Sequence, residues 1–469
     1  MNNRIFDDVQ MRDTQGLVFS GYGSMPFCSF YLLHINDKDK TRSWLKSLVD
    51  RITNGEPDQT ARSNNTSSLN LAISYSGFDQ LLEKKDSFEQ AFQEGMHSSR
   101  RTTVLGDQGN NHPDTWDWGN DKKPVDLLLM LYSKDQKNHD KRQKEEEAAF
   151  KESGLSLVKK LETSNLGESG RFAKEHFGFA DGISNPMVAG FSKSTKNPVS
   201  ANPQTPQVIA TGEFILGYPN GYDGKVTAIP KAGTLGEEFG VNGTYLVFRQ
   251  LQQDVKGFWT FINNEANTQG IDPDYLAAKF VGRWKNGAVV APGDTSAPDT
   301  VSNDFDFSDD LRGTGCPLGS HIRRANPRGQ GLGVEEVLKD NINTSLKVAN
   351  RHRILRRGRS YGNFLEKPLE DDDKGERGLF FICLNANIER QFEFVQHTWV
   401  NNLKFNGLYD EDDPLIGSYA SSDSSFKRSF TLQDDPLRRR VCNFQQFVTL
   451  RGGGYFFLPG IKALRMLGE

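Results

Sequence analysis

The sequence has few cysteines, and no two of them are close enough to form a metal-binding or redox motif. Its four cysteines, Cys28, Cys316, Cys383 and Cys442, lie far apart, and no C-x-x-C pair is present. Zinc fingers, iron–sulfur clusters and disulfide scaffolds need closely spaced or numerous cysteines, so these classes are excluded. Three of the four fall within or beside strand-like runs, and we expect them to be buried thiols.

Long hydrophobic runs are also missing. No apolar stretch approaches the ~20 residues that span a bilayer. The longest candidate, Val125–Tyr132, has the length of a strand. The first residues show neither a basic region followed by an apolar segment nor a twin-arginine pair, which are the marks of export signals. With a mean hydropathy of -0.62, the sequence predicts a soluble cytoplasmic protein without a membrane partner.

Neither sign of charge is in large excess. The 57 Lys and Arg residues and 61 Asp and Glu residues give a formal net charge of -4. This balance does not indicate a protein that binds nucleic acid over its whole surface. The 469 residues exceed what a single hydrophobic core usually supports, so two domains or one fused pair are expected.

Strands and helices alternate in the first half of the chain. The aromatic and aliphatic run Phe27–Ile35 predicts a buried strand, and apolar residues at helical spacing from Trp44 to Ile52 predict a helix after it. The same patterns predict strands at 69–75, 126–132 and 155–161 and helices at 78–92 and 138–152. This order is that of a split β-α-β, ferredoxin-like sheet.

A similar order recurs in the second half. Strands are predicted at 244–249, 378–383 and 454–458, and helices at 272–281 and 388–395. The fold class is therefore α+β, with two tandem ferredoxin-like domains and antiparallel sheets. We expect the N-terminal domain to cover residues 1–232 and the C-terminal domain residues 233–469. The polar segment 192–207 is expected to be a loop or linker.

One histidine stands in a distinctive setting. Within Cys316–Arg328, His321 lies among Gly, Pro and three arginines, after a long polar loop. A neutral imidazole is a common ligand for iron and zinc, and nearby arginines can neutralise anionic groups of a cofactor. That combination suits a haem, which needs an axial nitrogen and counter-ions for two propionates. The alternative is a basic, solvated turn whose histidine only bonds the backbone.

An acidic residue lies between two glycines in the segment His176–Pro186. Gly178 and Gly182 let the backbone bend tightly and approach a flat ligand, while Asp181 lies beside Phe and Ile residues. A carboxylate held against apolar groups can have a raised pKa, which suits proton transfer near neutral pH. Alone, this G-x-x-D-G pattern is more often an ordinary turn.

A third segment, His352–Gly362, is strongly basic. It places Arg356 after an apolar pair and before a glycine-rich bend. An arginine over a metal site can stabilise a developing oxyanion, because guanidinium stays protonated. Two other interpretations are a nucleic-acid patch and a basic strand edge. Against the first, Tyr361 is the only aromatic residue that lies among these arginines and could stack on bases.

Six segments together resemble the dye-decolourising peroxidases, a family of haem enzymes. They occur in the family's order along the chain, and Leu17–Leu48 also fits the family's opening strand and helix. One such match would be chance, whereas six in order are not. The six are His176–Pro186 with its G-x-x-D-G motif, Gly212–Pro219, Asn242–Arg249, Gly315–Arg328, Arg353–Gly358 and Gly452–Pro459.

The resemblance implies a fold, a cofactor and three central residues. The fold is a pair of ferredoxin-like domains of the dimeric α/β-barrel type, with haem b held mainly by the second. The proximal iron ligand falls on His321. The distal acid falls on Asp181, which would take a proton from peroxide and return it to the leaving oxygen. The distal arginine falls on Arg356, which would favour binding of the peroxide anion.

The resemblance also implies an acidic partner for the ligand histidine. Asp413 is the best match, although Asp410, Glu411 and Asp412 lie in the same turn. Such a carboxylate would hold the second imidazole N–H and push electron density toward the iron.

Cofactor contacts are implied at further positions. Phe381 and Leu379 match apolar residues over the distal face, Gly182 and Ile183 adjoin the cofactor, and Arg328 is matched to a propionate. Some members carry a distal asparagine two residues after the arginine, where this chain has Gly358. The expected handling of peroxide therefore depends on Asp181 and Arg356 alone.

The function implied by the resemblance is a haem peroxidase that uses hydrogen peroxide to oxidise bulky aromatic donors such as dyes and phenols. Because a bulky dye does not reach a buried haem, electrons are expected to pass through a surface Tyr or Trp. The candidates are Trp259, Trp284, Trp399 and Tyr361, each of which is also explained as a packing residue.

Two alternatives come from other classes of protein. One is a haem carrier with incidental peroxidase activity. The other is a nucleic-acid binder that uses the clusters around Arg324 and Arg356 and shows salt-dependent binding without haem. Neither the natural donor nor the choice between monomer and homodimer follows from the sequence.

Overall fold

The structure is a computed structural model. It describes residues 6–56, 65–83, 88–163, 174–191, 208–231, 236, 238–329, 339–370, 375–418, 428–434 and 436–469. The expected loop at 192–207 and the predicted domain boundary between residues 232 and 233 lie outside these ranges.

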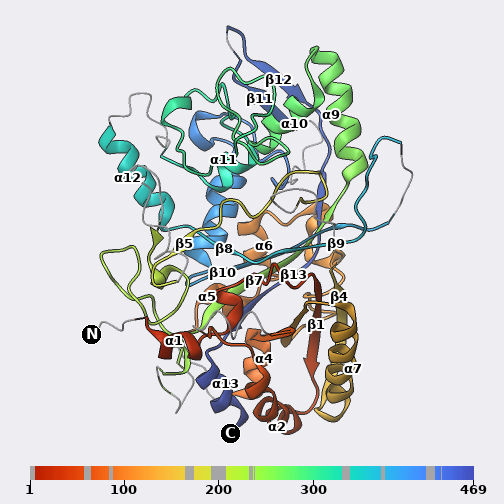
Figure 1. The fold of residues 1–469 in the computed structure, drawn as a ribbon, viewed down its shortest axis with the longest axis vertical. Coiled ribbons are helices and arrows are strands. Elements are labelled where there is room, and N and C mark those ends of the chain that lie inside the picture. The colour runs from red at the N-terminus through yellow and green to blue at the C-terminus, as the bar shows by residue number, and fades with distance from the viewer. Residues whose placement is uncertain are drawn as a thin grey trace.

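The fold combines a large sheet with helices on both halves (Figure 1). The strands are β1 Phe27–Ile35, β2 Ser67–Ile73, β3 Leu127–Ser133, β4 Leu155–Glu162, β5 Met187–Val188, β6 Val208–Ile209, β7 Thr244–Gln253, β8 Leu355–Arg356, β9 Arg359–Tyr361, β10 Gly378–Asn385, β11 Ser429–Leu432, β12 Arg439–Cys442 and β13 Val448–Leu458. The α-helices are α1 Asp8–Asp13, α2 Lys38–Leu48, α4 Tyr75–Leu81, α5 Gln90–Glu94, α6 Ser99–Leu105, α7 Gln136–Glu152, α9 Val255–Gln269, α10 Pro273–Val281, α11 His321–Ala325, α12 Lys339–Asn350 and α13 Ile461–Gly468.

The four strands of the N-terminal half pair in the order β4-β1-β3-β2, and all of these pairings are antiparallel. Helix α2 connects β1 to the segment before β2, and α7 connects β3 to β4. Asp37 and Asp135 accept hydrogen bonds from backbone N–H groups in the first turn of α2 and α7, respectively. Each aspartate is therefore the N-cap of its helix. This is the ferredoxin-like order that the sequence predicts.

The C-terminal half repeats that order. Its strands pair as β13-β7-β10-β8. Strands β7, β8, β10 and β13 therefore occupy the places that β1, β2, β3 and β4 have in the N-terminal half. The second strand, β8, is only two residues long and pairs with β10 at its edge, with Arg356 opposite Cys383. The predicted α+β fold with ferredoxin-like halves is confirmed, while the exact domain bounds stay a prediction.

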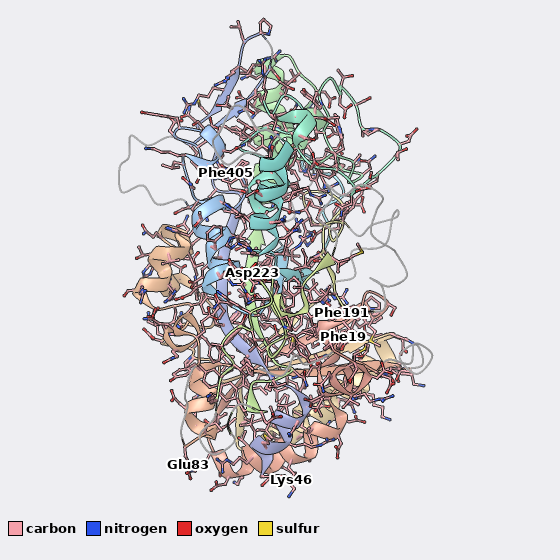
Figure 2. The ribbon with its side chains drawn as sticks, turned by 90° about the vertical axis from the view of Figure 1, so that its left-hand side faces the viewer. Phe19, Lys46, Glu83, Phe191, Asp223 and Phe405 are labelled. Atoms are coloured by element: carbon pink, nitrogen blue, oxygen red, sulfur yellow. The ribbon has the colours of Figure 1, made fainter. Side chains whose placement is uncertain are left out.

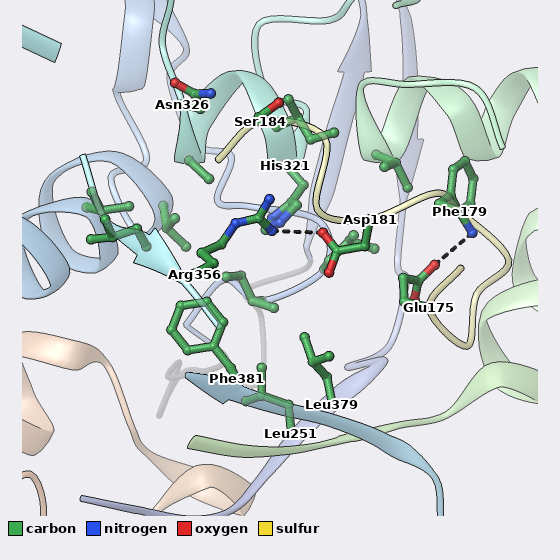
Figure 3. A pocket seen from close by; sticks show the side chains of 18 of the residues that line it. Glu175, Phe179, Asp181, Ser184, Leu251, His321, Asn326, Arg356, Leu379 and Phe381 are labelled. Atoms are coloured by element: carbon green, nitrogen blue, oxygen red, sulfur yellow. Dashed lines mark hydrogen bonds and ion pairs between the residues drawn. The ribbon is translucent and has the colours of Figure 1, made fainter. Parts of the chain in front are cut away.

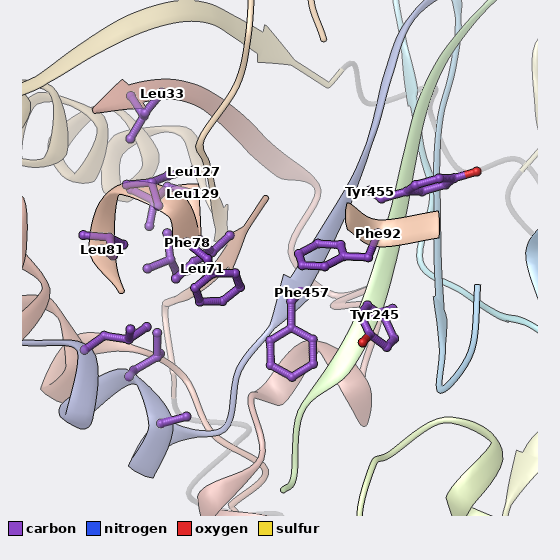
Figure 4. Close-up of a cluster of buried hydrophobic side chains, with 14 of the residues drawn as sticks. Leu33, Leu71, Phe78, Leu81, Phe92, Leu127, Leu129, Tyr245, Tyr455 and Phe457 are labelled. Atoms are coloured by element: carbon purple, nitrogen blue, oxygen red, sulfur yellow. The ribbon is translucent and has the colours of Figure 1, made fainter. Parts of the chain in front are cut away.

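The two halves join into one continuous sheet. Among the described strands, the connection is a single register pair, Phe457 of β13 with Ile73 of β2. Around this joint the apolar side chains of both halves form one core cluster (Figure 4). Phe78 and Phe457 pack there with ring centroids 6.1 Å apart. The joint therefore depends on side-chain packing more than on strand pairing.

The segment after the G-x-x-D-G motif is tied to the start of the chain. Figure 2 labels Phe19 and Phe191, whose ring centroids lie 4.7 Å apart. Phe6 packs against both rings, at 5.8 Å from Phe19 and 5.9 Å from Phe191. The segment His176–Pro186 is called the motif loop below. This aromatic cluster anchors the chain just after the motif loop on the N-terminal half.

Several elements differ from the predicted ones, and α9, α12 and α13 were not predicted at all. The helix expected at 78–92 is divided into α4 and α5, because Leu82 takes an extended conformation with φ -119° and ψ 138°. The helix expected at 388–395 is π-helical, over Glu389–Glu393 and Val395–Val400. The sequence predicts no bounds for β8, because two residues carry no periodicity, although a basic strand edge is one of the interpretations of His352–Gly362. Across the described residues, no helix is long and apolar enough to cross a membrane.

Candidate active site

A cavity of about 250 Å³ lies against the sheet of the C-terminal half (Figure 3). Strands β7, β8 and β10, the motif loop, α11 and the π-helical segment contribute to its wall. Of the residues selected from the sequence, seven line it: Asp181, Gly182, Ile183, His321, Arg356, Leu379 and Phe381. The structure thus brings together side chains that are far apart in the sequence. Asp181 and Phe381, for example, are separated by 200 positions.

Asp181 and Arg356 form an ion pair at the cavity. Nη1 of Arg356 lies 2.9 Å from Oδ1 of Asp181, and the backbone N–H of Gly182 donates to the same oxygen at 2.6 Å. Burial raises the pKa of the Asp181 carboxyl, but the Arg356 guanidinium and these hydrogen bonds outweigh it and hold the pKa below its usual value. The raised pKa expected from the sequence is therefore wrong, because the sequence did not show the contact with Arg356.

The backbone around this pair is held by Asn185. Its Oδ1 accepts a hydrogen bond from the backbone N–H of Arg356 at 3.0 Å, and its Nδ2 donates to the backbone carbonyl of Arg356 at 3.3 Å. Gly182 has a φ of +78°, in the region that favours glycine. The motif loop is thus fixed to β8, and the sequence reasoning missed Asn185.

His321 and Asp413 form a second pair. His321 is the first residue of α11, and its Nδ1 lies 2.9 Å from Oδ2 of Asp413. The Asp413 side chain is 0% exposed, and its Oδ1 accepts hydrogen bonds from the backbone N–H groups of Leu415 and Ile416 at 2.9 Å each. Because Nδ1 is bonded to the carboxylate, Nε2 is the nitrogen left for a ligand. Of the acidic residues crowded in this turn, Asp413 is the one that contacts His321.

These contacts affect both pKa values of the pair. Burial lowers the pKa of His321, but the Asp413 carboxylate outweighs it and leaves the pKa above its usual value. Burial raises the pKa of Asp413, but the contact with His321 and the backbone hydrogen bonds hold that pKa below its usual value. A carboxylate so placed fixes the orientation of the imidazole ring.

The floor of the cavity is apolar. Leu379 and Phe381 project from the same face of β10, and Leu251 of β7 is the register partner of Leu379. Figure 3 shows these three side chains below the Asp181–Arg356 pair. The alternate residue Phe380 faces the other side of the sheet and belongs to a separate core cluster. Such a floor presents no hydrogen-bonding side chain to the cavity.

Arg328 does not line the cavity. Its guanidinium donates to the backbone carbonyls of Asn303 and Phe305, to Oδ1 of Asn303 and to Oγ of Ser184. Arg283 and Arg353, which the sequence reasoning missed, line it instead. Contact of Arg328 with a propionate stays a prediction.

Arg283, Arg328 and Arg353 together form a cluster of positive charge, in which Arg283 and Arg328 are buried and Arg353 is half-buried. None of the three has a carboxylate ion-pair partner in the part of the chain that the structure describes, and Nε of Arg283 and Nε of Arg328 lack hydrogen-bond partners there. Burial lowers the pKa of Arg283 and of Arg353 to about 10. Uncompensated buried guanidinium groups are costly and suit an anionic ligand.

These features fit a haem. One imidazole nitrogen is available, the floor is apolar, and the buried arginines provide positive charge for two propionates. A carbon placed at the Cβ position of Gly182 would meet no atom within 4 Å, so the motif loop leaves space for a flat ligand.

The four aromatic residues expected at the surface are buried. Trp259 and Tyr361 are 7% exposed, and Trp284 and Trp399 are 4% exposed. The expectation of a surface position is therefore wrong for all four, and their packing in the interior explains them. Trp399 also lines the cavity.

Sequence reasoning also missed Glu175, a carboxyl that lines the cavity. Its oxygens accept hydrogen bonds from the backbone N–H groups of Phe177 and Phe179 and from Nε2 of Gln253. Burial raises the pKa of Glu175 to about 7 despite these bonds. Glu175 thereby closes the turn that leads to Asp181.

The sequence matches the model of one protein family and is similar to several known peroxidases. The model of the family described as "DyP dimeric alpha+beta barrel domain" matches residues 13–164. A dye-decolorizing peroxidase of Mycetinis scorodonius is 34% identical over 321 residues, which are 62% of this chain and 56% of that protein. Peroxidase 2 of the same organism is 29% identical over 473 residues and covers 93% of this chain and 83% of its own length. The chain thus spans little more than half of the first relative.

Solved structures share the fold over nearly the whole chain. An ancestral D-type dye-decolorizing peroxidase superposes with a TM-score of 0.79 at 26% identity, covering 97% of this chain and 98% of its own. A DyP-type peroxidase of Anabaena superposes with a TM-score of 0.81 at 23% identity, covering 98% and 95%. The second likeness shows the fold alone.

Proposed function

The chain belongs to the family of DyP-type, or dye-decolourising, peroxidases, and from this premise we propose that it is a haem-dependent peroxidase. Its oxidant would be hydrogen peroxide, and its donors bulky aromatic molecules such as anthraquinone dyes and phenols. Support comes from relatives named dye-decolorizing peroxidases, and one solved neighbour is described in complex with 2,6-dimethoxyphenol. The observation that carries the proposal is the Asp181–Arg356 pair, which a protein that only carries haem does not need.

We propose haem b as the cofactor, which His321 Nε2 would hold through the iron while Asp413 orients the imidazole. When bound, haem b would supply the redox-active group, iron and porphyrin together, that provides the two electrons for breaking the O–O bond of peroxide. Arg283, Arg353 and Arg328 provide positive charge for the propionates. Gly182 and Ile183 line the space that the ring requires.

Asp181 moves the proton. Both hydrogen bonds to its carboxylate end on Oδ1, and no described residue bonds Oδ2. Oδ2 therefore accepts a proton from one oxygen of hydrogen peroxide. The carboxyl group then returns this proton to the other oxygen, which leaves as water. Arg356 stabilises the negative charge on the peroxide while the proton is on Asp181. Leu379 and Phe381 exclude bulk water from this exchange.

The proposal is tested on purified protein loaded with haem. We expect a Soret band and peroxide-dependent bleaching of an anthraquinone dye. Asp181→Ala and Arg356→Leu should slow the bleaching while the Soret band is retained. Full activity in both variants contradicts the assignment. Rapid loss of haem to an apo-acceptor together with negligible turnover supports the haem-carrier alternative. The cytoplasmic location and the monomeric or homodimeric state stay predictions.

A further inference from the structure

A second, smaller cavity, here called the annex, lies beside the main one. Its volume is about 60 Å³. Leu251, Phe381 and Phe392 line both cavities, as do Gln396, Ile416 and Val448, so the two share a wall. No residue named above as a haem contact other than Phe381 lines the annex.

A buried ion pair, Asp107–Arg249, lines the annex. Nη2 of Arg249 binds Oδ1 of Asp107, and the two residues are 6% and 2% exposed, respectively. Asp107 follows Gly106, the C-cap of α6 with φ +70°. Arg249 lies on β7 opposite Phe381, on the same face of the sheet. The pair is thus placed by a helix end and a central strand.

The pair has unused hydrogen-bonding capacity. Oδ2 of Asp107 and Nε of Arg249 are buried and have no partner among the residues that the structure describes. Burial raises the pKa of Asp107 even though Arg249 lowers it. An unpaired buried polar atom loses its hydration without compensation, so such atoms in native proteins are normally bonded to another protein group or to ordered water, and here no described protein group takes that place.

Chemistry and size limit what that molecule is. Asp107 Oδ2 requires a donor and Arg249 Nε requires an acceptor, so the ligand has both functions. The volume of about 60 Å³ is room for only a few water-sized molecules. Hydrogen peroxide has two oxygens, two O–H donors and several lone pairs. An aromatic donor is too large.

We propose that the annex is a binding site for hydrogen peroxide, held between Asp107 and Arg249 next to the main cavity, with water in its place when peroxide is absent. The site deepens the proposed function and rests on it for its role in catalysis. It raises the amount of peroxide beside the Asp181–Arg356 pair, and its size excludes dyes and bulky hydroperoxides.

The kinetic test uses the double variant Asp107→Leu/Arg249→Met. Replacing both partners by apolar residues avoids the unpaired buried charge that a single substitution would leave. The second-order rate constant of the haem-loaded protein with hydrogen peroxide, measured by stopped-flow absorbance, should fall about tenfold, as expected for the loss of one hydrogen-bonded site. The rate constant with cumene hydroperoxide, which does not fit the annex, should be unchanged.

The matched control is Arg51→Met/Glu146→Leu, which removes a half-buried ion pair that lines neither cavity. Its two rate constants should equal those of the unaltered protein. An equal fall with both hydroperoxides in the Asp107/Arg249 variant, or no fall with either, overturns the proposal.

A structural measurement separates this site from the proposed function. In crystals of the unaltered protein soaked in hydrogen peroxide, we expect two-oxygen density within hydrogen-bond distance of Asp107 Oδ2. Ordered water alone, or an empty annex, overturns the site. If the density is present but no donor is oxidised, the proposed function fails and the site stands. Turnover with an empty annex contradicts the site alone.

Discussion

The two halves of the molecule share one strand order but differ in what covers the sheet. In the N-terminal half, Phe78, Leu71 and Leu129 are part of a closed core, and every residue of β3 is buried. In the C-terminal half, Leu251, Leu379 and Phe381 face a cavity of about 250 Å³. The same topology thus supports a filled interior in one half and a ligand-sized space in the other.

The difference originates in the connections between strands. Between β1 and β2 the chain runs from residue 36 to residue 66 and includes α2, whereas between β7 and β8 it runs from residue 254 to residue 354. This long connection contains α9, α10 and α11 and places His321 over the sheet. The short connection accompanies the filled core of the N-terminal half. The long connection crosses over the strands of the C-terminal half and forms part of the cavity wall.

The largest effect is expected where the cavity has its polar pair. Asp181→Asn keeps the shape of the side chain but removes the proton acceptor, so the rate constant with hydrogen peroxide should fall about 10²- to 10⁴-fold. Asp135→Asn, which alters only the N-cap of α7 in the N-terminal half, is the control and should leave that constant unchanged. Stopped-flow absorbance of both variants measures this rate constant. Similar rate constants in the two variants would show that the reaction with peroxide does not depend on the polar pair of the C-terminal half.

Packing in the two halves is compared by truncating one leucine in each. Leu129→Ala opens a void in a filled core and should lower the free energy of unfolding by about 2–5 kcal/mol. Leu379→Ala enlarges an existing cavity and should cost less, since fewer neighbouring atoms lose contacts. Urea unfolding of both variants measures the difference. Equal losses would show that the cavity wall is packed as tightly as the core.

A third prediction concerns the acidic turn in the C-terminal half. Asp413→Asn removes the carboxylate that orients His321 and should weaken haem binding about 10- to 100-fold. Asp410→Asn, at an exposed residue paired with Arg440, should leave haem affinity unchanged. Titration of the apo-proteins with haem distinguishes the two, and an equal effect would place the partner of His321 elsewhere in the turn.

The smallest effect is a shift in pH dependence. Asp181 must be ionised to accept a proton, and Arg356 holds its pKa below the usual value of 3.8. The rate constant with hydrogen peroxide should therefore stay level as the pH falls and decline only below that value. In Arg356→Leu the effect of burial remains without the opposing charge, so the decline should move to higher pH. Identical pH profiles would contradict the role of Arg356 in setting this pKa.

Much of this arrangement follows from the sequence, because local patterns encode it. Alternating and continuous apolar runs predict the long strands, and glycine-rich segments identify Asp181, His321 and Arg356. Strand β8 escapes prediction because it is two residues long and owes its place to pairing with β10. Nor does a local pattern distinguish the π-helical segment from an α-helix, since the same apolar spacing serves both.

The sequence gives weaker indications of residues whose role depends on distant partners. Arg283 follows a helix cap and Arg353 lies in an already basic segment, so neither stands out until burial without a carboxylate is seen. The pKa of Asp181 was predicted with the wrong direction for the same reason, because Arg356 is 175 residues away. Contacts of that range are set by topology.

Strand β13 has a consequence for how the protein is made. It follows every other described strand in the chain, yet it pairs with β7 along its length, carries Val448 of the cavity wall and supplies Phe457 at the joint with β2. The N-terminal half has all four of its strands once β4 has left the ribosome, at synthesis rates of about 5–20 residues per second. The second half must wait for β13, so a nascent chain holds a finished first half well before the wall of its cavity is complete.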